Sequence, residues 1–146
     1  MDPVLQLLVD HRAIVDLTVA YTFALDTKNW DALDEVFLPD ATAFLTEELT
    51  GREAIKARIR RALEQLDASQ HMISNHRIEI DGDRATGRCY LQAQHVREAA
   101  PGPPNFIVAG SYDDRYVRTP AGWRIEHRVL TIMWTEGNPA VARERR

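Results

Sequence analysis

Features that mark many functional classes are scarce in this chain of 146 residues. It contains one cysteine, Cys89, so no disulfide can form within the chain, which fits a reducing cytoplasm. No apolar run approaches the ~20 residues that a membrane-spanning helix needs. The start, Met1-Asp2-Pro3, lacks the basic residues and the cleavage site of a signal peptide. We therefore expect a cytoplasmic protein with no membrane partner.

Strong charge of one sign is also missing. The formal net charge is −4, and the densest basic cluster, Arg58 with Arg60 and Arg61, has the spacing of a solvated helix face. Nucleic acid is therefore not an expected partner. A glycine-rich phosphate loop, a Gly-x-Ser-x-Gly elbow and a His-Glu-x-x-His helix are absent, and the five histidines show no metal-ligand spacing. These absences favour chemistry by side chains alone, with no cofactor and no metal.

What is present fits one domain covering residues 1–146, of which 45% are hydrophobic. Apolar residues recur at three- and four-residue steps in the first half, which predicts a helix over about residues 4–29 and a short helix over 30–37. A short strand over 41–45 follows. Thr50-Gly51-Arg52-Glu53 has the order of a capping box, and the helix that it opens is expected to run to about residue 66.

The second half changes to the two-residue period of β-strands. Alternation predicts strands over residues 73–80, 84–96, 106–117 and 123–134, with a hairpin turn at 81–83 and a proline-rich loop at 99–104. The polar tail after Glu136 is expected to be loose. Helices followed by an antiparallel meander indicate an α+β fold, in which the helices pack on one face of a curved sheet.

Asp26 and His71 are the leading candidates for chemistry. Asp26 ends an apolar run, and a buried carboxylate needs a partner because an unpaired charge away from water is costly. A histidine would turn that partnership into acid–base chemistry, since Asp26 would fix one ring nitrogen of His71 and leave the other free as a base. The alternative from spacing alone is that Asp26 caps a turn and His71 merely begins a strand.

The alternation raises a difficulty for His71. A regular strand would send His71 to the polar face, whereas His76 and the isoleucines after it would face the core. An inward His71 therefore requires a bulge near Ser74-Asn75. Without such a bulge, His76 would be the competing base.

Tyr21 and Arg128 are weaker candidates. Tyr21 and Asp26 are about 140° apart around an ideal helix, so they can border one cavity only if the helix end loosens or the cavity is wide. The Tyr21 hydroxyl could then donate to a substrate oxygen, and otherwise Tyr21 is a core tyrosine. Arg128 shares a strand face with large apolar residues up to Trp134. It could bind a substrate oxygen, pair with an acid such as Asp26, or snorkel at a subunit interface.

His95 and the pair Asp113-Asp114 can each be explained by a purely structural role. His95 lies on a strand face of small residues, where it could line a pocket or could equally be a satisfied core histidine. Asp113-Asp114 is most simply the polar edge of a strand.

The order of several short motifs resembles the SnoaL-like branch of the NTF2-like superfamily. The resemblance covers about residues 8–134 and rests on Tyr21-x4-Asp26-x3-Trp30-x2-Leu33-x3-Phe37, Asp40-Ala41, Gly51, Ile55, His71-x3-Asn75, Asp81-Gly82-Asp83, Gly110-x-Tyr112 and Gly122-Trp123-Arg124-Ile125-x2-Arg128. It implies an α+β cone, in which a strongly bent, mostly antiparallel sheet wraps around N-terminal helices and encloses an apolar pocket. The bend of that sheet would also turn His71 inward.

Within this branch, Asp26 and His71 match the Asp–His dyad shared by scytalone dehydratase, bile-acid 7α-dehydratase and hexachlorocyclohexane dehydrochlorinase. Tyr21 and Arg128 match the positions of substrate contacts in the bile-acid enzyme. The resemblance thus implies catalytic roles for these four residues. Three more are expected to line the substrate pocket: His95, Tyr112 and Trp134.

The implied activity is that of a cofactor-independent lyase, a dehydratase acting on a small, largely apolar, cyclic substrate. Two alternatives remain open: an isomerase or polyketide-type cyclase with the same base, and a non-catalytic module for small-molecule binding or assembly. The resemblance further implies a homodimer or homotrimer, which apolar residues on both faces of the last strand would suit.

Overall fold

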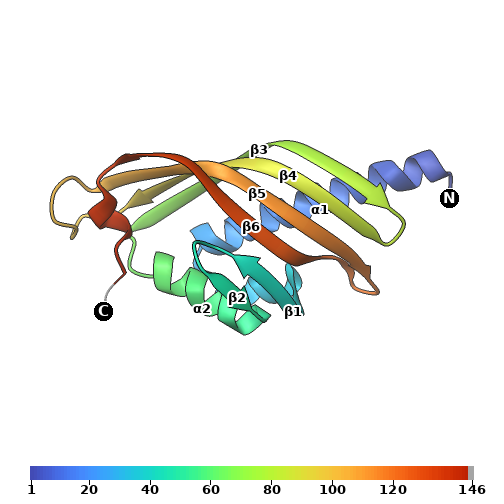
Figure 1. The fold of residues 1–146 in the computed structure, drawn as a ribbon, viewed down its shortest axis with the longest axis horizontal. Coiled ribbons are helices and arrows are strands. Elements are labelled where there is room, and N and C mark those ends of the chain that lie inside the picture. Colours follow the sequence, from blue (N-terminus) through green and yellow to red (C-terminus); the bar gives the residue numbers. More distant parts are fainter. Residues whose placement is uncertain (145–146) are drawn as a thin grey trace.

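The computed structural model describes residues 1–144 and consists of helices that precede a six-stranded sheet (Figure 1). The elements are α1 (Pro3–Asp26), a 3-10 helix (Trp30–Glu35), β1 (Phe37–Phe44), β2 (Glu48–Thr50), α2 (Arg52–Leu63), β3 (Ala68–Asp81), β4 (Arg84–Val96), β5 (Asn105–Thr119), β6 (Gly122–Gly137) and a second 3-10 helix (Pro139–Ala142).

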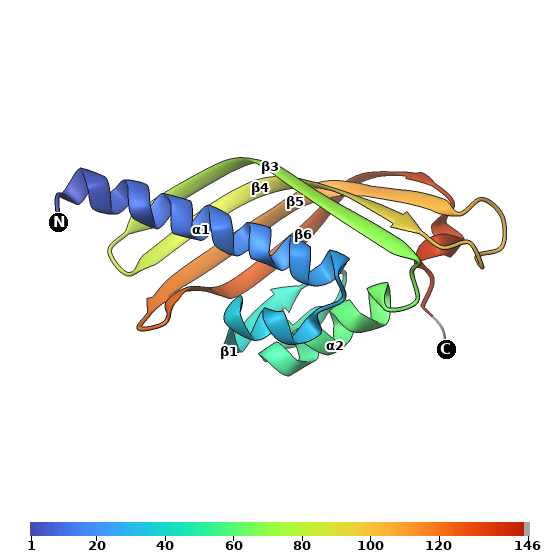
Figure 2. The same ribbon diagram turned by 180° about the vertical axis from the view of Figure 1, so that it is seen from behind.

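The strands pair in the order β2-β1-β6-β5-β4-β3, and all neighbours are antiparallel except β1 and β6. Figure 2 shows α1 lying across one face of the sheet, with α2 on the same side, while the other face carries no helix. The expected α+β architecture with helices on one face of a curved sheet is confirmed. Among the described residues, no helix has the length and apolar character required to cross a bilayer.

The end of α1 places a carboxylate beside the sheet. The Asp2 side chain caps the helix start by accepting a hydrogen bond from the Val4 N–H at 2.7 Å. The helix ends at Asp26, three residues earlier than the sequence pattern suggested, because Lys28 adopts a left-handed conformation with φ of +55°. Asp26 is therefore the last helical residue and faces β3 rather than solvent.

A bulge in β3 decides which histidines face the helices. The pairing of β3 with β4 shifts between Ser74 and Arg77, and Asn75 has φ of +57°, a conformation that asparagine tolerates better than most residues. Burial alternates on both sides of this point, so His71 and His76 both face inward. The bulge that an inward His71 requires is thus present, and it resolves the conflict between the two histidines.

Two local expectations were wrong, and a third is confirmed in altered form. The helix α2 has Gly51 at its N-cap position, with φ of +91° and no side-chain cap, so no capping box forms at Thr50. The short helix expected over 30–37 is present as a 3-10 helix, Trp30–Glu35, and it ends early because β1 already begins at Phe37. The tail, which was expected to be loose, forms a 3-10 helix after Asn138, and the buried residues of this helix include Val141. Residues 145 and 146 of that tail lie outside the described part of the chain.

A buried ion pair ties α1 to the β5–β6 hairpin. The Asp10 carboxylate is 3% exposed and accepts two hydrogen bonds from Arg118, each 2.7 Å long, and a third from the indole N–H of Trp123 at 3.2 Å. The Arg118 hydrogen bonds outweigh the effect of burial and lower the pKa of Asp10 to about 2. The same guanidinium lies 4.6 Å from the centre of the Trp123 ring.

Asp10→Asn is expected to lower the free energy of unfolding by about 2 kcal/mol at pH 7, because the pKa of Asp10 lies below that of an unfolded carboxyl. This contribution is present above about pH 4 and disappears as the pH falls toward 2, so wild type and variant should converge there in urea denaturation. Asp83→Asn is the control, since the 81% exposed Asp83 also binds Arg118 and should cost less than about 1 kcal/mol. Equal losses in both variants would contradict this account.

Candidate active site

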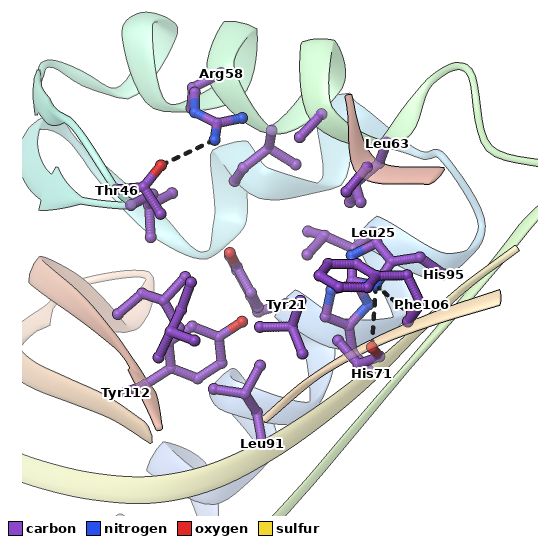
Figure 3. Close-up of a pocket in the computed structure, with 18 of the residues that line it drawn as sticks. Tyr21, Leu25, Thr46, Arg58, Leu63, His71, Leu91, His95, Phe106 and Tyr112 are labelled. Atoms are coloured by element: carbon purple, nitrogen blue, oxygen red, sulfur yellow. Dashed lines mark hydrogen bonds between the residues drawn. The ribbon is translucent and has the colours of Figure 1, made fainter. Parts of the chain in front are cut away.

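A cavity of about 240 Å³ lies between α1, α2 and the inner face of the sheet (Figure 3). Its wall is mostly apolar and includes Leu25, Leu63, Leu91, Phe106, Val108 and Ile132. The polar side chains of its wall include Tyr21, His71, His95 and Tyr112. A small apolar cavity with a few convergent polar groups has the usual composition of a small-molecule site.

Asp26 and His71, distant in the chain, meet at the wall of this cavity. The His71 Nδ1 lies 2.6 Å from Asp26 Oδ1, and the His71 backbone N–H donates to Asp26 Oδ2 at 2.9 Å. The Ser69 hydroxyl donates to the same Oδ1 at 3.0 Å. Asp26 thus lies behind His71 and does not line the cavity. Tyr21 and Asp26 can therefore point in different directions from α1, because only Tyr21 needs to reach the cavity.

The electrostatics of this pair favour an ionised Asp26 and a fixed His71 ring. Burial disfavours the carboxylate, but the His71 hydrogen bonds outweigh burial and lower the pKa of Asp26. An ionised carboxylate only accepts hydrogen bonds, so the His71 Nδ1 carries a proton, and in the neutral ring Nε2 is the nitrogen with the lone pair. The C-terminal end of α1, where Asp26 lies, also favours a positive charge nearby.

Tyr21 and Tyr112 present two phenol groups to the same cavity. Their rings meet edge to face with centroids 5.6 Å apart. Burial raises the pKa of Tyr21 and raises that of Tyr112 well above its ordinary value. Both phenols are therefore neutral near pH 7 and can donate hydrogen bonds to an oxygen in the cavity.

Arg128 lies beneath these tyrosines and does not line the cavity. It is fully buried and forms two hydrogen bonds of 2.8 Å with Asp114, which in turn accepts one from the Tyr116 hydroxyl. Its guanidinium is 4.3 Å from the ring centre of Tyr21 and 3.9 Å from that of Tyr112. The acid that pairs with Arg128 is thus Asp114 and not Asp26, and Asp114 is not a polar strand edge.

Trp134 lies outside the cavity. The pairing of β5 with β6 shifts between Ala109 and Gly110, so that Ala109 pairs with Trp134 whereas Gly110 pairs with Ile132. This irregularity leaves Ile132 in the cavity wall and turns Trp134 to the outer face, beside Met133. Strict alternation from Arg128 would place Trp134 on the inner face of the sheet. The expectation that Trp134 lines the pocket is wrong, because the register shift interrupts this alternation.

Sequence reasoning missed the polar part of the cavity wall around Arg58. Arg58 was expected on a solvated face, yet its side chain is 17% exposed, donates to the Thr46 hydroxyl at 3.1 Å, and forms ion pairs with Glu47 and Glu144. Helical spacing could have indicated this placement, because Arg58 follows the buried Ile55 by three residues and shares its face. Glu144 belongs to the tail that was expected to be loose.

The arrangement can perform acid–base chemistry on a small molecule. His71 offers a basic nitrogen whose charge Asp26 would balance, and the phenols of Tyr21 and Tyr112 offer donors to a developing oxyanion. Within residues 1–144, no group of three or more His, Cys, Asp or Glu side chains is placed to hold a metal ion.

Arg128→Met should lower the free energy of unfolding by about 3–5 kcal/mol, because it leaves the Asp114 charge buried without a partner. Adding Asp114→Leu should restore much of this loss. Arg12→Met is the matched control, since the exposed Arg12 pairs with Asp16 at 2.9 Å and is expected to contribute less than about 1 kcal/mol. Chemical denaturation that ranks the two single variants equally would contradict the buried-pair account.

Comparisons with known proteins identify the family of the chain. The profile of the SnoaL-like domain matches residues 6–129. Rv2910c, an uncharacterized protein of Mycobacterium tuberculosis, is 36% identical over 126 residues, and the match covers 84% of each chain.

Two solved structures are similar over most of their length. The Kfla4162 protein from Kribbella flavida has a TM-score of 0.85 and 28% identity, covering 91% of this chain and 97% of that one. A scytalone dehydratase candidate from Novosphingobium aromaticivorans has a TM-score of 0.80 and 26% identity, covering 88% and 87%. The profile match spans most of the sequence, and the protein therefore belongs to the SnoaL-like family and has the NTF2-like fold.

Proposed function

We propose that this protein is a cofactor-independent lyase that removes water from a small, largely apolar, cyclic substrate. The observation that carries the proposal is the hydrogen bond between His71 Nδ1 and Asp26 Oδ1, made at the wall of an apolar cavity. The similarity to a scytalone dehydratase candidate supports a dehydration rather than another reaction of the same base.

In the proposed reaction, His71 Nε2 removes a proton from a carbon next to a carbonyl group. Asp26 keeps Nδ1 protonated and balances the positive charge that the ring acquires. Tyr21 and Tyr112 donate hydrogen bonds to the carbonyl oxygen as negative charge develops there. The electron pair then forms the carbon–carbon double bond, and the leaving hydroxyl takes the proton from His71 and departs as water.

Arg128 has a different role in this proposal from the direct substrate contact that the family resemblance implies. It is fully buried and bound to Asp114, so it reaches the substrate only through the tyrosine rings that it supports. A cation beneath both rings fixes their positions, and its field favours negative charge near their hydroxyls.

The first alternative is an isomerase or polyketide-type cyclase with the same base and no leaving group. A product of unchanged mass would favour it over the dehydratase. The second alternative, a non-catalytic binding module, would have no need for a histidine held at 2.6 Å by a carboxylate with three hydrogen bonds.

His71→Ala and Asp26→Ala are expected to lower turnover of responsive β-hydroxy ketones by about 10²–10⁴-fold, because each removes the general base or its orienting partner. Mass spectrometry should show loss of water by wild type. His76→Ala is the control, since His76 also faces inward but bonds to the Thr18 hydroxyl at 2.9 Å and does not line the cavity. Equal turnover by wild type and His71→Ala would end the dehydratase proposal for those compounds.

We also propose that a second copy of the chain covers the outer face of the sheet, giving a homodimer or homotrimer. Four large apolar side chains are exposed there around one groove: Met72, Tyr90, Met133 and Trp134. Beside them, Arg88 and Asp113 offer charges of both signs, which a second copy of the same surface can match. Contiguous exposed apolar groups of this kind mark interaction surfaces.

Met133→Glu combined with Trp134→Glu should convert the oligomer to a monomer, because each copy would bury uncompensated charge. Light scattering after size exclusion measures the mass. Phe23→Glu is the control, since Phe23 is 65% exposed on α1, away from the proposed interface. A monomeric wild type would refute the proposed assembly.

A further inference from the structure

The wall of the cavity carries a positively charged side chain from α2. Each of the three guanidinium nitrogens of Arg58 has a partner: Nε lies 3.2 Å from Glu47, Nη2 donates to the Thr46 hydroxyl at 3.1 Å, and Nη1 lies 2.9 Å from Glu144. Figure 3 shows Arg58 on the α2 side of the cavity and His71 on the side of the sheet. A ligand that spans the cavity from α2 to the sheet therefore meets Arg58 at one end and the proposed base at the other.

Arg58 shares its two acids with Arg61, three residues further along α2. The Arg61 guanidinium lies 2.8 Å from Glu47 and 3.3 Å from Glu144. These four side chains together have no net charge. Without Glu144, the remaining three have one uncompensated positive charge, and Arg58 brings this charge to the wall of an apolar cavity.

Glu144 lies beyond the part of the tail that is anchored in the core. The anchor is Val141, which is fully buried. The second 3-10 helix ends at Ala142, so Glu144 follows it without regular secondary structure. Its side chain is 37% exposed, and ion pairs that are partly solvated contribute little to stability. The Glu144 carboxylate can therefore leave Arg58 while Val141 stays in place.

We propose that Arg58, together with Arg61, forms a carboxylate-binding subsite of the cavity, which Glu144 occupies and which the carboxylate of a bound cyclic acid takes over. The inference rests on the function proposed above, since it adds one anionic group to the largely apolar cyclic substrate. Guanidinium groups bind carboxylates through charge-assisted hydrogen bonds, and these two already hold both oxygens of Glu144. When Glu144 moves into solvent, one bound carboxylate restores the charge balance.

The rest of the cavity sets the size and the charge of the ligand. Its volume of about 240 Å³ holds roughly a dozen non-hydrogen atoms at protein packing density, which suits one or two rings. Apolar side chains such as Leu63 and Phe106 face these rings. Departure of Glu144 leaves a single positive charge, which matches a monoanionic carboxylate better than a dianionic phosphate. The subsite therefore fits a cyclic monocarboxylic acid.

Binding of 2-naphthoate and 2-naphthamide tests the subsite without requiring turnover. The two compounds have the same rings and similar shape, but only 2-naphthoate is charged at pH 7. Glu144→Gln keeps the size of the side chain and removes the competing charge. This variant should bind 2-naphthoate about 10-fold more tightly than wild type in isothermal titration calorimetry, with no change for 2-naphthamide.

A second substitution and a matched control identify the source of this gain. Adding Arg58→Gln to Glu144→Gln should abolish the gain, because the cation at the cavity wall is then lost. Glu64→Gln makes the same change of net charge on an exposed residue that pairs with Arg60 at 3.0 Å and does not line the cavity, so both affinities should stay at their wild-type values.

Four results would overturn the inference, provided that circular dichroism shows folded variants. They are an unchanged affinity of Glu144→Gln for 2-naphthoate, an equal gain for 2-naphthamide, an equal gain in Glu64→Gln, and failure of Glu144→Gln to bind either compound.

The subsite and the lyase fail separately, because the titrations involve no chemistry at His71. An active dyad whose Glu144→Gln variant gains nothing would leave the lyase standing and remove the subsite. A selective gain for 2-naphthoate in a protein whose His71→Ala variant loses no turnover would leave the subsite standing and remove the lyase.

Discussion

The hydrogen bond between Asp26 and His71 is the interaction on which the site depends. Two local irregularities bring its partners together: α1 ends at Asp26 because Lys28 turns left-handed, and β3 bulges at Asn75. Without the left-handed turn at Lys28, α1 would continue beyond Asp26. Without the bulge in β3, His71 and His76 could not both face inward. Interruptions of regular secondary structure thus position both residues of the pair.

Beneath the cavity, a buried ion pair supports the groups that would meet the substrate. Arg128 and Asp114 are both inaccessible to solvent and form two hydrogen bonds with each other, while Arg128 Nη1 has no hydrogen-bond partner among the described residues. Such a pair is a weak source of stability, because removing two charges from water offsets much of their attraction. Its guanidinium lies against the rings of Tyr21 and Tyr112, so the pair can also hold these two phenols in position at the cavity wall.

The sequence predicted the architecture and the central pair because both leave local signals. Periodicity separated helices from strands, and the order of short motifs around Asp26 and His71 matched one family. What failed depended on single irregularities that alternation cannot reveal. The register shift in β6 moved Trp134 to the outer face. Asp114, taken for a strand edge, is buried because Arg128 lies opposite it on β6, a contact that no local pattern encodes.

The central claim is that Asp26 fixes the tautomer of His71, and two-bond proton–nitrogen NMR of the labelled imidazole reads this directly. The account predicts that the neutral His71 ring carries its proton on Nδ1 and has a bare Nε2, and that this preference disappears in Asp26→Leu. A wild-type ring protonated on Nε2, or an identical spectrum in folded Asp26→Leu, would contradict it.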